Sequence, residues 1–426
     1  MKINRNINRR HFIESVAAAT GGLMLARNKL FGMQKETFPS TKYFWYRRTL
    51  NDPYIDSQNG NMAFGFTDDG TVLMSEDNSH TWPHKAKFAN AKNLTFSHIF
   101  KNGNVLFATQ NKLYLSTDKL QTIQEKIVKN PDGSNYFPHV PKNPKYPGWY
   151  FIPHVYVDSW IIGGREMLVW GGYTNVRGGA APVNIYYSND NGHTVKIAYA
   201  FGQNPKFRDN GGPGGGGKEG TLLGDPYNPH FCRHIHCVAY NPVEKAFYAC
   251  TGDNDNGLPN GIHEVKWLRG IYNDLRDEWD WKVIIEASAN SRYKGGGINF
   301  VDGKMYFVAD ANGSKKPYDR GLFRCDPVDI TNKDKHELML PLKYATCDMI
   351  IQDGIIIIGQ IPSESSYTCG IIYSPDMGKS WEEFDLKEFG PRLPRKFNYK
   401  NSEGWFRVDL RKGYIDRGEV LFIKPK

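Results

Sequence analysis

After residue 41, apolar and polar residues alternate along most of the chain in short runs that are separated by turn residues. Such alternation is typical of half-buried β-strands, so the pattern predicts a chain built of many short strands. The clearest example is the segment 232–253, CRHIHCVAYNPVEKAFYACTGD. Its two alternating runs flank Asn241-Pro242, which interrupts a strand, and together they predict an antiparallel hairpin.

One face of this predicted hairpin is polar. A turn centred near residues 243–244 predicts which residues of the two strands lie opposite each other. These cross-strand pairs are Cys237–Cys250, His236–Thr251 and His234–Asp253. The two histidines, the threonine and the aspartate then share one face, because residues two apart on a strand point the same way. Burying a polar side chain on a strand costs free energy of folding unless the group forms a hydrogen bond or serves a functional site. A structural His–Asp pair and a functional site both fit this pattern.

A short motif of the form S-x-D-x-[GS]-x-T-W recurs along the chain. It occurs at Ser75–Trp82, returns with changes at Ser188–Val195 and Ser374–Trp381, and has a degenerate copy at Ser116–Thr122. In such a turn the carboxylate and the hydroxyl groups accept hydrogen bonds from backbone N–H groups. The copies resemble the Asp-box turns of sialidase-like β-propellers, and this resemblance implies a propeller fold without indicating a function.

Strand runs between these turns divide the chain into blades of about 40 residues. The predicted blades are 60–90, 92–130, 148–200, 232–288, 295–341, 345–388 and a seventh made of EGWFRVDL, EVLFIKP and the strand near 42–50. This closure joins both ends of the chain and hides sheet edges. We therefore expect an all-β fold, a single seven-bladed propeller over residues 41–426, with six or eight blades as the alternatives.

The N-terminal segment predicts export. Arg9-Arg10 followed by the small apolar stretch VAAATGGLMLA resembles a twin-arginine (Tat) signal over residues 1–33, with a basic N-terminal helix as the alternative. We expect a periplasmic or secreted protein. Residues 1–30 carry five of the nine net positive charges. The rest of the sequence has no stripe of lysine and arginine interleaved with aromatic residues, so we expect no nucleic-acid binding. It also has no apolar run long enough for a transmembrane helix, so we expect no membrane span.

Histidine, tyrosine, arginine and aspartate recur near the start of the innermost strand and the end of the second strand of several predicted blades. In a propeller these two positions lie on the same face of the ring. A lone histidine there is equally explained as a paired core residue, but several converging on one mouth favour a functional site. The candidates, in chain order, are His98, His154, Tyr173, Arg177, Arg233, His234, His236, Asp253, Arg292 and Tyr293. Cys232, His234 and His236 share a face and also fit a zinc site.

Histidine, tyrosine and arginine without an evident carboxyl pair suit β-elimination better than glycoside hydrolysis. In elimination at a uronic acid, an arginine neutralises the carboxylate and a neutral histidine or tyrosine removes the C5 proton. A tyrosine or histidine then protonates the leaving oxygen at C4. A mildly basic rim agrees with an anionic sugar.

The segments 171–205 and 232–253 resemble the propeller polysaccharide lyases of the ulvan-lyase group and a related family that holds both rhamnose–glucuronate lyases and α-L-rhamnosidases. The resemblance implies a seven-bladed propeller in which His98 and His154, or a nearby tyrosine, act as acid and base while Arg177 neutralises the carboxylate. It also implies a structural or assisting calcium or zinc ion. The rhamnosidase members use a single histidine early in the chain, whereas the corresponding stretch here, residues 56–59, carries Gln58.

We therefore predict an exported lyase that cleaves a rhamnose–glucuronate type glycan, with an α-L-rhamnosidase-like hydrolase or a non-catalytic carbohydrate-binding propeller as alternatives. The predicted catalytic residues are His98, His154, Tyr173 and Arg177. The predicted substrate-binding residues are Arg233, His234, His236, Asp253, Arg292 and Tyr293. We expect a monomer whose partner is an acidic polysaccharide or oligosaccharide, and whose chemistry requires no cofactor.

Overall fold

The computed structural model describes residues 38–49, 53–109, 111–138, 151–173, 183–203, 224–252, 263–313, 315–361, 369–390, 392–411 and 419–426. The predicted signal, Arg177 and Asp253 lie outside these residues. The chain divides into two units, residues 1–41 and 42–426, and the propeller belongs to the second.

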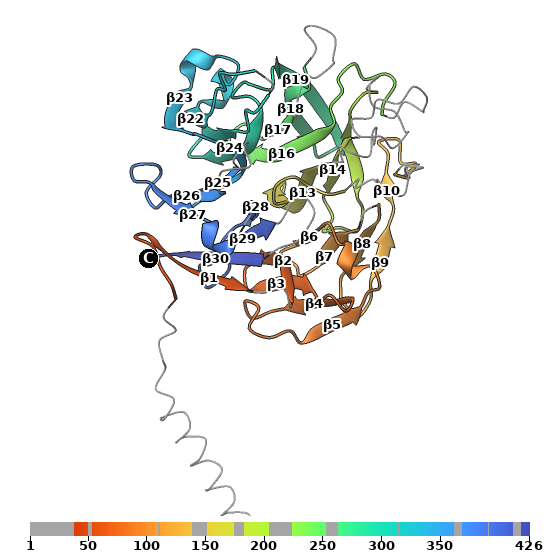
Figure 1. Ribbon diagram of the computed structural model, residues 1–426. Helices are drawn as coiled ribbons and strands as arrows, with labels where there is room; N and C mark the ends of the chain where they lie inside the picture. Colours follow the sequence, from red (N-terminus) through yellow and green to blue (C-terminus); the bar gives the residue numbers. More distant parts are fainter. Residues whose placement is uncertain are drawn as a thin grey trace, which may run out of the picture. The chain divides into compact units, whose positions relative to one another are not determined.

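Within the described residues the strands form seven sheets that follow one another in chain order around a ring (Figure 1), and their pairing is antiparallel except where β10 runs parallel to β15. Each blade is given from its innermost strand outwards. Blade 1 contains β2 (Tyr54–Asn59), β3 (Met62–Phe66), β4 (Thr71–Ser75) and β5 (His84–Lys87). Blade 2 contains β6 (Phe96–Ile99), β7 (Val105–Ala108), β8 (Leu113–Ser116) and β9 (Gln124–Lys126), and blade 3 contains β12 (Asp158–Ile162), β13 (Arg165–Gly171), β14 (Asn184–Ser188) and β15 (Lys196–Ala200). Blade 4 contains β16 (His234–Asn241), β17 (Ala246–Gly252), β18 (Val265–Asn273) and β19 (Glu278–Ala287), and blade 5 contains β20 (Gly295–Val301), β21 (Lys304–Ala309), β22 (Gly321–Cys325) and β23 (Glu337–Pro341). Blade 6 contains β24 (Ala345–Gln352), β25 (Ile355–Ile361), β26 (Gly370–Ser374) and β27 (Glu382–Asp385). Blade 7 contains β28 (Leu393–Asn398), β29 (Phe406–Arg411), β30 (Glu419–Pro425) and β1 (Phe44–Thr49).

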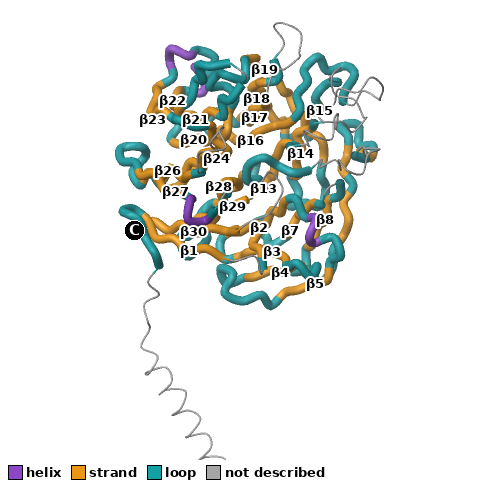
Figure 2. Tube along the Cα trace, viewed as in Figure 1, coloured by secondary structure: helices purple, strands orange, loops and turns teal. Residues whose placement is uncertain are grey.

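The remaining elements are few. Two short strands, β10 (Val128–Lys129) and β11 (Asn135–Tyr136), extend the third sheet beside β15. The short 3-10 turns lie in connections, as Figure 2 shows by colour, and they are η1 (Ala91–Asn93), η4 (Pro327–Asp329), η5 (Lys333–Lys335) and η6 (Lys387–Phe389). In the described part of the chain, no helix has the length and apolar character that a membrane crossing requires.

The seven-bladed fold confirms the sequence prediction, including the composite last blade. β1 pairs antiparallel with β30, from Phe44 opposite Pro425 to Thr49 opposite Val420. The prediction lacked β28, the innermost strand of that last blade, and two predicted boundaries are wrong. Blade 1 begins at Tyr54 rather than residue 60, because β2 is its innermost strand, and β10 belongs to the third sheet rather than to blade 2.

Apolar side chains between neighbouring blades form the core. Between blades 4 and 5, for example, the buried Trp267 ring packs edge-on against Phe307, with the centroids 5.3 Å apart. Between blades 1 and 2, Phe64 stacks on Phe107 at 5.3 Å. Burying a side chain of this size stabilises the fold by about 1.5–3 kcal/mol, so the blade interfaces hold the ring together.

The four S-x-D segments share one hydrogen-bonding pattern. In each, the serine hydroxyl donates to the aspartate, and the aspartate accepts the backbone N–H of the residue four positions later. These N–H···O distances are 2.9 Å for Thr81, 2.9 Å for Thr122, 2.8 Å for Thr194 and 2.7 Å for Ser380. Hydrogen bonds from Thr81 and Ser75 lower the pKa of Asp77 to about 2.

The innermost strands share an irregularity that sequence alternation does not reveal. In the described residues, an extra residue interrupts the pairing of five of them with their second strands. The interruptions lie between Ile55 and Ser57, Ile235 and Cys237, Gly295 and Gly297, Thr346 and Asp348, and Arg395 and Asn398. A bulge turns the local side chains, so it decides which residues reach the centre of the ring.

The bulge in β16 corrects the predicted hairpin register. Cys237 lies opposite Cys250, as predicted. Beyond the bulge, however, His234 lies opposite Gly252 rather than Asp253, and Thr251 lies opposite Ile235 rather than His236. The extra residue at His236 shifts the partner of every preceding residue by one.

Candidate functional site

Three histidines and one tyrosine from blades 3 and 4 stack against one another. We call His154, Tyr173, His234 and His236 the stacked cluster. The Tyr173 ring lies 4.6 Å from the His154 ring and 4.2 Å from the His234 ring, measured between centroids, and both pairs are close to parallel. His154 in turn lies 4.9 Å from His236. The three imidazoles are buried, and Tyr173 is partly exposed.

Backbone contacts between the two blades hold this cluster in place. The Tyr173 N–H donates to the Ile152 carbonyl at 2.6 Å, which joins the end of β13 to the segment that carries His154. The Ile235 N–H donates to the Gly172 carbonyl at 3.0 Å and so joins β16 to the same place. The rings therefore stack because three separate segments are tied together directly beside them.

The bulge at His236 fixes the orientation of its ring. Its Nδ1 lies 2.8 Å from the Gly295 carbonyl, which can only accept, so Nδ1 carries a proton. In the neutral imidazole the lone pair then lies on Nε2, which is the state that a general base requires.

Gly252 leaves the room that His236 needs. A Cβ atom at this position would lie 2.8 Å from His236 Cε1 and 3.1 Å from Lys294 Cε. Both side chains therefore converge on the same point opposite β17. Lys294 is almost fully buried, and its ammonium lies 3.3 Å from the Asp310 carboxylate. A positive charge thus lies next to the stacked cluster.

The other predicted binding residues are held by their own partners. The Arg233 guanidinium donates to Glu264 at 2.9 Å. Arg292 donates to Asp319 at 2.7 Å and lies over the Phe323 ring at 4.3 Å.

Two further candidates are buried. The Tyr293 hydroxyl donates to the Ile330 carbonyl at 2.9 Å, and burial raises the pKa of this phenol to about 12. Cys232 is buried too, which raises the pKa of its thiol well above the ordinary value. Among the described residues, no three histidine, cysteine, aspartate or glutamate side chains are placed so that they could hold a metal ion together.

His98 belongs to a different group from the stacked cluster. Its Nδ1 lies 3.3 Å from the Val157 carbonyl, and its Nε2 lies 3.1 Å from the Ser159 hydroxyl. That hydroxyl is also 2.6 Å from the Glu166 carboxylate. Burial raises the pKa of Glu166, but hydrogen bonds from His98 and Ser159 outweigh this effect and leave it below its ordinary value. The structure therefore brings together three of the four predicted histidines with Tyr173, and places the fourth, His98 of blade 2, elsewhere.

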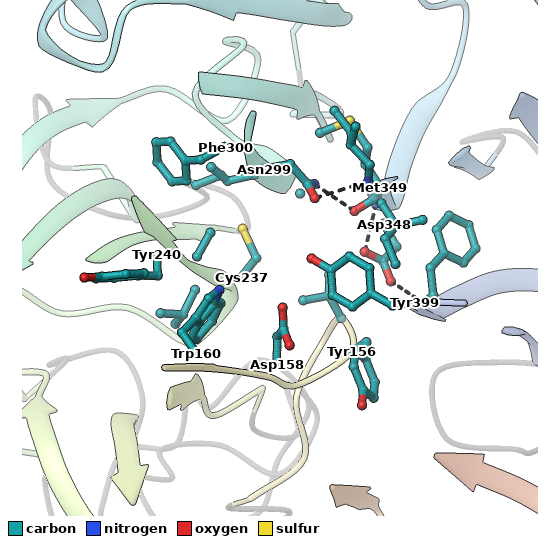
Figure 3. A pocket seen from close by; sticks show the side chains of 18 residues that line it. Tyr156, Asp158, Trp160, Cys237, Tyr240, Asn299, Phe300, Asp348, Met349 and Tyr399 are labelled. Carbon is teal, nitrogen blue, oxygen red and sulfur yellow. Dashed lines mark hydrogen bonds between the residues drawn. The ribbon is translucent and has the colours of Figure 1, made fainter. Parts of the chain in front are cut away.

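A cavity of about 110 Å³ lies on the axis of the ring, enclosed by the innermost strands of blades 3 to 7 (Figure 3). Tyr156, Asp158, Asp348 and Tyr399 line it, and none of them was selected from the sequence. Two of them could have been predicted from the sequence. Tyr156 and Asp158 follow His154 at intervals of two residues, and in an extended segment such residues point in the same direction, here towards the axis of the ring.

No protein-family model matches the chain, and neither does any curated protein. Several solved structures resemble it at low identity. YCF48 bound to D1 peptide is 12% identical with a TM-score of 0.49, covering 92% of this chain and 98% of that one. A streptogramin B lyase structure is 12% identical with a TM-score of 0.47, covering 90% and 98%. An α-L-arabinanase from Penicillium chrysogenum, complexed with arabinobiose, is 11% identical with a TM-score of 0.42, covering 78% and 94%. These values have no bearing on the chemistry of the site.

Proposed function

We propose that the protein is an exported polysaccharide lyase that cleaves a uronate-containing glycan of the rhamnose–glucuronate type by β-elimination. The proposal is carried by one observation: a phenol and three imidazoles stack at the meeting point of blades 3 and 4. These are the side chains that can remove and deliver protons near neutral pH. The resemblance of the segments 171–205 and 232–253 to propeller lyases supports the same reaction.

Each step of the elimination has a suitable group in or beside the stacked cluster. A neutral imidazole, His236 through Nε2 or His154, takes the proton from C5 of the uronate, which requires the glycan to open access to rings that are buried in the free protein. The electron pair of that C–H bond forms the C4–C5 double bond, and the C4–O bond breaks. The Tyr173 hydroxyl gives its proton to the leaving oxygen. General acid–base catalysis of this kind contributes about 100-fold to 10,000-fold to a rate.

The uronate carboxylate must be neutralised before its C5 proton becomes acidic. Arg177 is the residue predicted for this role, and it lies outside the described residues. Lys294 is the cation that the described residues supply beside His236. Its pairing with Asp310 holds the ammonium in place, which favours a fixed electrostatic role over a mobile one.

The alternatives differ in their products. Elimination creates an unsaturated uronate with a characteristic ultraviolet absorbance, hydrolysis creates reducing ends without that absorbance, and a binding propeller creates neither. The decisive experiment incubates the protein with rhamnose–glucuronate glycans and follows both signals. Reducing ends without ultraviolet absorbance would exclude the lyase proposal in favour of the hydrolase.

A matched pair of variants tests the site. Tyr173→Phe removes only the hydroxyl and should lower the elimination rate at least about 100-fold. Tyr227→Phe makes the same change at a tyrosine that is 92% exposed, and it should leave the rate unchanged. Equal rates for the two variants would remove Tyr173 from the mechanism.

A further inference from the structure

The axial cavity continues from the stacked cluster along the same innermost strands, because Val155 and Cys237, which line it, directly follow His154 and His236 in the chain. His234, in the cluster, begins β16, whereas Val238 and Tyr240 of the same strand line the cavity. Six residues of strand span about 20 Å, so His234 and Tyr240 lie towards opposite ends of the ring's axis. The lyase mechanism proposed above uses none of the groups that line this cavity.

Two carboxyl groups from opposite sides of the ring face the cavity. Asp158 comes from blade 3 and accepts the backbone N–H of Ser159 at 2.8 Å. Asp348 comes from blade 6 and accepts the backbone N–H groups of Met349 and Phe397, each at 2.8 Å. In the described part of the chain, neither carboxyl forms an ion pair with a lysine, arginine or histidine within 4.0 Å. Figure 3 shows the Asp158 carboxyl and the Tyr399 hydroxyl pointing into the same space.

The rest of the wall is aromatic and aliphatic. Trp160, Tyr240 and Phe300 lie towards the end of the cavity away from Asp348, as Figure 3 shows. All three are partly exposed, and so is Val238, which indicates that the cavity communicates with solvent. Polar groups therefore gather at one side of the cavity and flat apolar surfaces at the other.

A ligand that fits this wall has hydrogen-bond donors on one side and C–H groups on the other. An ionised carboxylate only accepts hydrogen bonds and a protonated carboxyl adds one O–H donor, so this pair selects hydroxyl groups, and an ionised member repels another carboxylate. Aromatic rings pack against apolar faces. A neutral pyranose has both features, with hydroxyl groups at its edge and C–H bonds on its faces, whereas a uronate brings a repelled charge.

We propose that the axial cavity is a second carbohydrate site, which binds one neutral sugar residue through Asp158, Asp348 and Tyr399 and packs it against Trp160. The choice of a sugar as the ligand rests on the proposed function; the requirement for a neutral hydrogen-bond donor rests on the cavity alone. Burial raises the pKa of Asp158 to about 6 and that of Asp348 to about 7, so near neutral pH Asp158 is mostly ionised and Asp348 is partly protonated.

Isothermal titration of the full-length protein with methyl glycosides tests the proposal. The probes are a neutral hexoside, a 6-deoxyhexoside and a pentoside, with glucuronate and glucosamine for comparison. We expect saturable binding of at least one neutral glycoside and none of glucuronate in the same concentration range. Asp158→Asn should weaken that binding by about 10-fold or more, because a hydrogen bond to a charged group is lost.

The controls separate this site from the stacked cluster. Tyr173→Phe should bind the neutral glycoside as the unaltered protein does, whereas Tyr240→Ala, at the partly exposed wall, should bind it more weakly even if Asp158→Asn does not fold. Failure of all three neutral glycosides to bind, tighter binding of glucosamine, or loss of binding in Tyr173→Phe would overturn the proposal.

The outcomes for the two sites are distinguishable. If no glycan gives the unsaturated product, the lyase proposal fails while the titration still reports on the cavity. If elimination occurs but no neutral glycoside binds, only the second site is wrong.

Discussion

The Tyr173 phenol ring lies against the His234 imidazole with the ring centroids 4.2 Å apart and 17° between the ring planes. His234 is completely buried, and its position at the first residue of β16 brings blade 4 into contact with the end of β13. The pair therefore contributes to the packing of two blades as well as to the candidate site.

Replacing His234 tests this packing role. His234→Ala should lower the free energy of unfolding by about 2–4 kcal/mol, because it removes the stacked ring and leaves a cavity. His234→Phe keeps a flat ring and should recover most of that loss. Urea unfolding of both variants measures the difference. Equal destabilisation by alanine and phenylalanine would mean that the ring nitrogens, and not the stacking, hold the residue in place.

Gly252→Ala should damage the site through crowding. The new Cβ would lie 2.8 Å from His236 Cε1, so the imidazole or the backbone of β17 must move, at a cost of about 1–3 kcal/mol. We expect lower stability in thermal unfolding and a reduced elimination rate. Gly370→Ala is the matched control, because its Cβ would lie 3.4 Å from the Phe384 carbonyl. A fully active and stable Gly252→Ala variant would contradict the described position of His236.

The acidic cavity should make stability depend on pH. The folded pKa of Asp158 is raised by burial from 3.8 to about 6, so its favourable contribution is complete below about 3.8 and is lost as the pH rises through about 6. Asp158→Asn cannot ionise. We expect its stability relative to the unaltered protein to improve by on the order of 2 kcal/mol between pH 4 and pH 8.

Urea unfolding across that pH range makes the measurement. The groups that face Asp158 are His98, Glu166 and Tyr399, and the ionisation of Tyr399 lies far above the range, since burial raises its pKa well above the ordinary value. Repeating the series in a His98→Gln background separates the histidine from the aspartate. A difference between Asp158→Asn and the unaltered protein that stays constant with pH would show that Asp158 keeps an ordinary pKa in the folded protein.

The S-x-D turns should show the opposite dependence. Hydrogen bonds from Thr81 and Ser75 lower the pKa of Asp77 from 3.8 to about 2, so the carboxylate stabilises the fold above about 3.8 and this contribution is lost as the pH falls through about 2. Asp77→Ala should lower the melting temperature at pH 7 and much less at pH 2. Asp68→Ala, at an exposed position, is the control. A melting-temperature loss of the same size at both pH values would point to a side-chain effect other than charge.

The sequence predicted the ring better than it predicted the centre of the ring. Alternation and turn chemistry are local signals, and they were enough to divide the strands into seven blades and to join β1 to β30. A bulge leaves no such signal: one extra residue at His236 moved His234 from Asp253 to Gly252. The stretch around His154 was predicted as a strand, yet β12 begins only at Asp158, and this irregular segment is what allows His154 to reach His236.

His98 shows a second limit of prediction from sequence. His98 and His154 hold equivalent positions along their predicted strands, so both were expected at the same end of the ring's axis. In the structure, however, the His98 ring points to Ser159 and Glu166 of the next blade. Side-chain direction depends on twist and on the neighbouring blade, and neither can be counted along a single strand. The same reason explains why Asp348 and Asp158, which are 190 positions apart, could not be paired beforehand.

The pairing of β1 with β30 has a consequence for how the chain is made. Of the described strands, β1 leaves the ribosome first and β30 last, so the final blade has no partner for β1 until synthesis reaches residues 419–425. Contacts this distant in sequence form slowly, and an unpaired edge invites association with other chains. A chain shortened before residue 419 should therefore remain an open, aggregation-prone sheet.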